Sequence, residues 1–186
     1  MSVEFNRVAP DAVDNIQVNA GMIVKTFDPS EPAAPQDSDI VCATTGGITA
    51  TCVPEFEDFG ADIDNMPNNT KEMKRIVGYT CTLAFTLLNI EDETIVLSLA
   101  AASKLGNEVV VRNELVGSDF KDIWFLSEKV NNTVIAICLK NAISTGGFNY
   151  KTQKNGKGQL TVTLTGHFSI NDPDKVPMQF YSAKVD

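Results

Sequence analysis

The sequence predicts a mainly β protein, a β-sandwich or barrel-like arrangement of strands with one flanking helix and one long polar loop. Apolar and polar residues alternate with period two at 45–57 and again at 77–87, which indicates long, half-buried strands. A second pair of alternating segments lies at 148–151 and 160–170, on either side of a turn rich in Lys and Gly. Such one-sided strands must bury their apolar faces against each other or against a helix.

Threonine dominates the polar face of these strands. In the first pair, Thr80 and Thr82 alternate with Cys81, Leu83 and Phe85. The simplest interpretation of this face is an ordinary solvated sheet surface. The alternative is that the strands are staves of a larger barrel closed between subunits, with the threonines lining its lumen, because closure removes exposed strand edges.

Each pair of long strands begins with a similar motif. Thr44-Thr45-Gly46-Gly47-Ile48 opens the first pair, and Ser144-Thr145-Gly146-Gly147-Phe148 opens the second. The motif is too short to prove a duplication. It predicts a glycine kink or bulge at the entry to each pair.

One helix is expected at 91–104. Acidic residues at 91–93 suit the positive end of a helix dipole, and Ile95, Leu99 and Ala102 form an apolar stripe at helical spacing. The polar loop is expected at 58–70.

Short β-rich runs and turn signals give the remaining elements. A strand at 21–27 precedes a proline-rich loop at 28–39, and Asn131-Asn132 is expected to form a hairpin turn. Further strands are expected at 109–111, 123–130, 133–140 and, as an edge strand, 176–185.

Composition excludes several classes of function. The chain has 186 residues, 43% of them hydrophobic and 21% charged, which fits one globular domain over 1–186 with an irregular N-terminal arm at 1–19. It has no apolar run of about 18 residues that could cross a membrane and no basic, apolar start typical of a signal peptide, so a cytoplasmic site of synthesis is expected. A net charge of -9 disfavours a nucleic-acid reader, which normally has a basic face.

No catalytic, cofactor or metal site is predicted. The four cysteines stand singly in apolar stretches, as reduced core thiols do, and His167 is the one histidine and belongs to a threonine row. Asp62 and Asp64 resemble the start of a calcium loop, but Pro67 replaces the glycine that its sharp turn requires. The sequence therefore predicts a protein that is not an enzyme.

The loop region carries both signs of charge. Lys71, Lys74 and Arg75 lie close in sequence to Asp62 and Asp64. A loop of this kind can dock head-to-tail on a copy of itself, or it can simply be solvated.

Seven short segments between Asn19 and Tyr181 carry a resemblance to a known family. They are 39–48 (DIVCATTGGI), 56–60 (FEDFG), 62–65 (DIDN), 67–74 (PNNTKEMK), 119–125 (DFKDIWF), 142–148 (AISTGGF) and 165–170 (TGHFSI). Together they resemble the major tail (tail-tube) proteins of siphophages that infect Gram-positive hosts.

The resemblance implies a structural role in a virion. Proteins of this family have a β-sandwich-like fold with a helix on its flank, and they form hexameric rings that stack into a tube around the tape-measure protein. Other expected partners are the tail terminator and distal tail proteins. DNA would pass through the lumen without sequence-specific binding. The resemblance implies assembly in the host cytoplasm, residence in the virion tail, no cofactor and no membrane partner.

The resemblance also assigns roles to segments of this chain. Strands 45–57 with 74–88, and 147–152 with 159–170, would be the staves, and loop 58–70 would reach the adjacent ring. The lumen-facing candidates are Thr49, Thr51, Glu55, Glu57, Thr80, Thr82, Thr86, Asn149, Lys151, Thr161, Thr163, Thr165 and His167. The inter-ring candidates are Asp58, Asp62, Asp64, Asn65, Asn68, Asn69 and Lys71. An acidic or neutral lumen would repel phosphates, and Lys151 departs from that pattern.

Two alternatives remain at the level of the sequence. One is the tube of a contractile tail or of a phage-derived particle, which the residues do not separate from the first interpretation. The other is a soluble β-sandwich that binds a ligand, which predicts exposed aromatic residues clustered on one face. Trp124 and Phe125, an adjacent aromatic pair, are interpreted as core plus interface.

Overall fold

The computed structural model describes residues 8–184 and confirms the mainly β fold class. Eight strands form one antiparallel sheet in the order β1-β6-β7-β9-β3-β2, with β10 paired to β7 and β8 paired to β9, and β4 and β5 form a separate hairpin. The strands are β1 Met22–Val24, β2 Thr44–Asp58, β3 Lys74–Leu87, β4 Ala102–Leu105, β5 Glu108–Val111, β6 Lys121–Glu128, β7 Thr133–Ser144, β8 Asn149–Lys151, β9 Gln159–Thr165 and β10 Met178–Lys184. The helical segments are α1 Asp92–Ser98 and the 3-10 turns η1 Pro10–Asn15, η2 Lys71–Met73 and η3 Gly117–Asp119.

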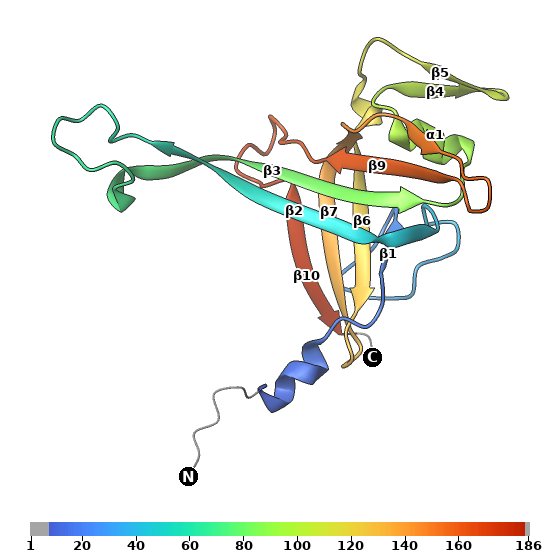
Figure 1. The fold of residues 1–186 in the computed structure, drawn as a ribbon, viewed down its shortest axis with the longest axis horizontal. Helices are drawn as coiled ribbons and strands as arrows, with labels where there is room; N and C mark the ends of the chain where they lie inside the picture. The colour runs from blue at the N-terminus through green and yellow to red at the C-terminus, as the bar shows by residue number, and fades with distance from the viewer. Residues whose placement is uncertain (1–7, 185–186) are drawn as a thin grey trace.

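The sheet folds over itself into two crossing layers. In Figure 1, β6, β7 and β10 run across the direction of β2, β3 and β9. Strand β7 belongs to both layers, because its first part pairs with β6 and β10 while Ile143 and Ser144 pair with β9. Asn141, with φ of +47°, marks the place where β7 leaves one layer for the other.

The core lies between the two layers and consists of the apolar faces predicted from alternation. Leu83 and Leu87 of β3 and Leu160 and Leu164 of β9 are fully buried, in contact with a cluster that includes Leu139 of β7. Burying a leucine side chain stabilises the fold by roughly 1.5–3 kcal/mol. Strands β3 and β9 therefore pack against the core through one face, and their opposite face lies on the outside of the molecule.

A second apolar cluster covers the other side of β6 and β7. Trp124 packs edge-on against Phe27, with ring centroids 5.7 Å apart, and lies 5.5 Å from the ring of Tyr181. Trp124 and Phe125 are 8% and 7% exposed, so both are core residues and the expectation that this pair is core plus interface is confirmed only for the core. Phe27 precedes the proline-rich segment 28–39, which contains no strand, as predicted.

The predicted helix is too long at its C-terminal end. Helix α1 ends at Ser98, and residues 102–105 form β4, which pairs with β5 across a turn where Gly106 has φ of +62°. The pairing with the valines of β5 outweighs the local helical pattern. The buried face of α1 is also different from the predicted stripe, because Thr94 and Ser98 are the buried side chains.

Strand β9 is shorter than predicted, because it ends at Thr165 and not at residue 170. At Gly166 an added Cβ would lie 2.7 Å from Leu139 Cδ1 and 3.0 Å from the carbonyl oxygen of Lys140, so the chain crosses close to β7 there. It then turns away, and Ile170 is 96% exposed instead of lying on the apolar face. Strand β8 is also shorter than the predicted 147–152.

Part of the N-terminal arm is more regular than predicted. Within the predicted arm 1–19, η1 spans Pro10–Asn15 and Gln17 forms a β-bridge to Lys129. Residues 1–7 lie outside the described part of the chain. Among residues 8–184, no helix has the length and apolar character needed to cross a bilayer.

Candidate functional site: the threonine face and the hairpin arm

Threonine side chains of neighbouring strands lie opposite one another across the outer face of the sheet. Thr51 pairs with Thr82, which pairs with Thr165. The next row joins Thr49, Ala84 and Thr163, and the row after it joins Thr45, Thr86 and Thr161. Paired residues of antiparallel strands share a face, so the rows form one continuous surface. We call this surface the threonine face; it comprises Thr45, Thr49, Thr51, Val53, Glu55, Glu57, Arg75, Gly78, Thr80, Thr82, Ala84, Thr86, Asn149, Lys151, Gln159, Thr161, Thr163 and Thr165.

Some of the hydroxyl groups on this face form hydrogen bonds with neighbouring side chains. The Oγ1 atoms of Thr51 and Thr82 are 2.5 Å apart, and those of Thr145 and Thr165 are 2.7 Å apart. Thr80 donates a hydrogen bond of 2.5 Å to Glu55 Oε1. Most members of the face are neutral and polar, so it presents a mainly polar and mostly uncharged surface.

The two double-glycine motifs interrupt opposite edges of the same layer. Thr45 pairs with Thr86 and Ile48 with Phe85, so Gly46 and Gly47 are two extra residues in β2. On the other edge, β7 ends at Ser144 and β8 begins at Asn149, and the chain bends between them. The kink or bulge predicted at each motif is confirmed, as a bulge in β2 and as a bend between β7 and β8.

Strands β2 and β3 continue beyond the two-layered body as a hairpin arm, which we define as residues 53–79. Figure 1 shows this arm projecting from the body and ending in the loop between the strands. Among the described residues the register shifts once within it, between Glu55 and Phe56, where Val77 is the extra residue in β3. Such a bulge increases the local twist of a hairpin. The predicted apolar face of β3 is therefore interrupted at Val77, which is exposed.

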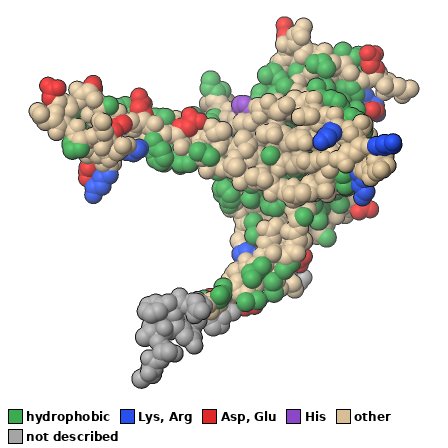
Figure 2. Space-filling model, in the orientation of Figure 1, with side chains coloured by type: hydrophobic (Ala, Val, Ile, Leu, Met, Phe, Trp, Pro, Cys, Tyr) green, Lys and Arg blue, Asp and Glu red, His purple; other side chains and the backbone are tan. Residues whose placement is uncertain are grey.

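The arm exposes apolar side chains that the body would otherwise cover. Phe56 is 55% exposed and its cross-strand neighbour Ile76 is 50% exposed. Nearer the body the same side of the sheet carries the buried Cys81 and Leu83. Figure 2 shows hydrophobic side chains gathered along one side of the arm. This exposed apolar surface was not predicted from the sequence. The pattern that indicates it is the apolar alternation of β2 and β3, which continues past the part of these strands that the body covers.

The loop at the end of the arm is compact, and Asp58 organises it. The carboxylate of Asp58 accepts hydrogen bonds of 2.9 Å from the backbone N–H groups of Gly60 and Asn69. These two hydrogen bonds lower the pKa of Asp58 below its ordinary value, and the bond from Gly60 has the larger effect. Lys74 Nζ donates to Asn69 Oδ1 at 2.8 Å, and Asn65 and Asn69 adopt positive φ.

The inter-ring candidates therefore separate into two groups. Asp58 and Asn69 hold the loop together, as described above. The exposed candidates at the end of the arm are Asp62, Asp64, Asn65, Asn68 and Lys71. Asp62 and Asp64 take part in no ion pair among the described residues.

His167 does not continue the row of Thr161, Thr163 and Thr165 along β9, because the strand ends before it. Its Nδ1 atom lies 3.2 Å from the carbonyl oxygen of Asn141, and its ring packs edge-on against Phe120 at 5.4 Å. The histidine thus lies at the place where β7 changes layers.

All four cysteines are free, and three of them are buried. Burial raises the pKa of Cys42 and of Cys81 to about 12 and that of Cys138 to about 11, so these three thiols stay protonated at neutral pH. Cys81 Sγ lies 3.4 Å from Cys52 Sγ on the paired strand. In residues 8–184 no three His, Cys, Asp or Glu side chains come together as a metal site would require.

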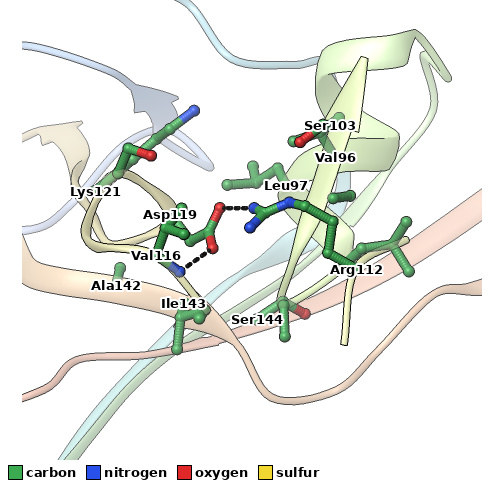
Figure 3. Close-up of a pocket in the computed structure, with 14 residues that line it drawn as sticks. Val96, Leu97, Ser103, Arg112, Val116, Asp119, Lys121, Ala142, Ile143 and Ser144 are labelled. Carbon is green, nitrogen blue, oxygen red and sulfur yellow. Dashed lines mark hydrogen bonds and ion pairs between the residues drawn. The ribbon is translucent and has the colours of Figure 1, made fainter. Parts of the chain in front are cut away.

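A pocket of about 480 Å³ lies between α1, β4 and the segment leading to β6 (Figure 3). Arg112 and Asp119 form an ion pair across it, and Asp119 Oδ2 accepts a hydrogen bond of 2.8 Å from the Val116 N–H. The pKa of Asp119 is lowered mainly by the hydrogen bond from the Val116 N–H and, to a smaller extent, by the guanidinium of Arg112. Both residues belong to the β5–β6 connection, so the pair holds the two ends of that connection together. Ser103, Lys121 and Ser144 also line the pocket.

Comparison with known proteins assigns no family to this chain. A scan against protein-family models finds no match, and a search of curated protein sequences finds none either. Among solved structures, a chain from the virion of a native gene transfer agent particle is similar over 87% of this chain and 95% of that chain. The two share 7% sequence identity with a TM-score of 0.43, which is too low to assign a common fold.

Proposed function

We propose that this chain is the repeating subunit of a phage tail tube, a structural virion protein that assembles into stacked hexameric rings. The observation that carries the proposal is the threonine face, which lies in register across β2, β3, β9 and β8. A sheet with one buried apolar face and one smooth polar face suits the wall of a channel.

Unpaired strand edges support closure between subunits. Within residues 8–184, β2 is paired on one side only over its 15 residues, and β8 lies at the opposite edge of the same layer. Exposed edges attract further strands, and a closed barrel removes them. Closure of several copies side by side would bury both edges and turn the threonine face toward a common lumen.

The charge of the threonine face suits a conduit for DNA. Its charged members are Glu55, Glu57, Arg75 and Lys151, two acidic and two basic, and the rest are neutral. A lining without net positive charge does not attract phosphates, so DNA slides through without being held. The proposed partners are other copies of the chain, the tape-measure protein inside the tube, and the tail terminator and distal tail proteins at its ends.

Negative-stain electron microscopy of the purified protein over a concentration series tests the proposal. Rings or tubes with a central hole are the expected result. Particles of monomer size at every concentration, even with the tail initiator proteins added, would contradict it and favour a soluble binding module.

A further inference from the structure

We propose that the acidic end of the arm docks on the basic β8–β9 turn of a second copy, so that subunits stack head-to-tail. The tip is residues 58–74, and the turn is residues 151–158. The inference rests on the proposed function, because it names the surface that receives the arm when rings stack.

The tip and the turn lie at opposite ends of one layer of the sheet. Asp58 pairs with Lys74 at the arm end of β2 and β3, whereas Leu87 at the other end of β3 pairs with Leu160. The turn lies beyond that level, since Lys151 pairs with Gln159. A contact between tip and turn within one chain is thus excluded, and a contact between two copies extends the layer along its length.

The two ends carry opposite charge. The turn contains Lys151, Lys154 and Lys157 and no acidic residue, and all three lysines are exposed. In the tip, Asp58, Asp62, Asp64 and Glu72 outnumber Lys71 and Lys74. Figure 2 shows acidic side chains along the arm and Lys or Arg side chains at the far end of the molecule. The three turn lysines form no ion pair among the described residues, so these charges are free to meet.

Each end also places exposed apolar groups beside its charges. Behind the tip lie Phe56 and Ile76, and beside the turn lie Phe148 and Tyr150, which are 46% and 43% exposed with ring centroids 6.3 Å apart. Tyr150 pairs with the buried Leu160, and Ile76 with Phe56, so both apolar groups belong to the apolar side of the layer. An apolar centre beside complementary charges is the usual composition of a specific interface.

The contact uses two different surfaces of the same chain. Such a heterologous contact leaves one free tip and one free turn after every addition, so it repeats without limit unless a rotation closes it. Stacking of rings into a tube requires a contact of this type. The charges fix the direction of the stack, because tip meets turn but repels another tip.

Charge reversal at each end, separately and together, tests the inference. The tip variant is Asp62→Lys with Asp64→Lys, and the turn variant is Lys154→Glu with Lys157→Glu. Each variant alone should still form rings, but its tubes should be at least about tenfold shorter than those of the wild type, because like charges then meet where rings stack. Electron microscopy and sedimentation measure the tube length. A mixture of the two variants should recover tubes, since each tip again faces a turn of opposite sign.

The outcomes separate this inference from the proposed function. If the wild type forms neither rings nor tubes, both fail. If the wild type forms tubes and either variant stacks normally, or if the mixture stays as short as its components, the docking inference fails while the tube assignment stands. The matched control, Glu31→Lys with Asp37→Lys, reverses two exposed acids in the 28–39 loop and should leave tube length unchanged. Asp62→Asn with Asp64→Asn should shorten the tubes less than the lysine variant does, and this milder pair is the check that the lysine variant has not simply misfolded.

Discussion

At the scale of single residues, the carboxylate of Asp58 decides the shape of the arm's tip. It accepts the N–H groups of Gly60 and Asn69, and these bonds hold its pKa below the ordinary value of 3.8. A carboxyl group with a lowered pKa stabilises the folded loop at pH above its ordinary value, and the effect is lost as the pH falls through the lowered pKa. The tip should therefore open progressively as the pH falls below 3.8 and through the lowered pKa of Asp58.

Hydrogen exchange of residues 59–73 measured against pH checks this prediction. Asp58→Ala should reproduce at pH 7 the fast exchange that the wild type shows only in acid. Asp62→Ala is the control, because Asp62 accepts no backbone hydrogen bond in the described structure. Exchange that is equally slow in the Asp58→Ala protein would contradict the assigned role.

Gly166 is a second residue whose role depends on close approach. A Cβ there would lie 2.7 Å from Leu139 Cδ1 and 3.0 Å from the carbonyl oxygen of Pro177. Gly166→Ala should reduce the free energy of unfolding by about 1–3 kcal/mol, as overpacking of a core does. Gly117→Ala is the control, because no atom lies within 4 Å of its added Cβ. Urea denaturation of the two variants distinguishes them, and equal midpoints would contradict the close approach.

At the scale of the elements, the two faces of β3 should respond in opposite ways to charge. Thr82→Lys places an ammonium group on the half-buried threonine face and should cost about 1 kcal/mol, mainly the lost hydrogen bond to Thr51. Leu83→Lys places the same ammonium group in the buried core, where an unpaired charge destabilises the fold so strongly that the protein should unfold. Thermal denaturation followed by circular dichroism compares them. An unfolded Thr82→Lys protein would make that face core and remove the basis of the lumen proposal.

The elements also show what a sequence can predict and what it cannot. Alternation with period two located β2, β3 and the threonine face, because that pattern is the direct consequence of strand geometry and one-sided burial. The ends of elements depended on distant partners: β5 converts the end of the predicted helix into β4, and β7 stops β9 at Gly166. His167 was therefore assigned to a row that ends before it.

The arm was predicted only in part, for a similar reason. Its loop was recognised from polar residues, but the exposure of Phe56 and Ile76 follows from the length of the body, which no local pattern records. The sequence alone does not relate the lysines of the β8–β9 turn to the tip. Only the strand pairing shows that they lie at the other end of the same layer.

At the scale of the whole molecule, the tip of the arm should be dispensable for folding and necessary for stacking. Glu57 pairs with Arg75, so replacing residues 58–74 by Asn-Gly leaves a hairpin closed by a favoured two-residue turn. Of the side chains removed, none belongs to the buried core, so the free energy of unfolding should change by less than about 1 kcal/mol. Sheet edges and the threonine face are unchanged, and rings should therefore still form. Electron microscopy should show rings without tubes, whereas tubes of normal length would mean that stacking uses another surface.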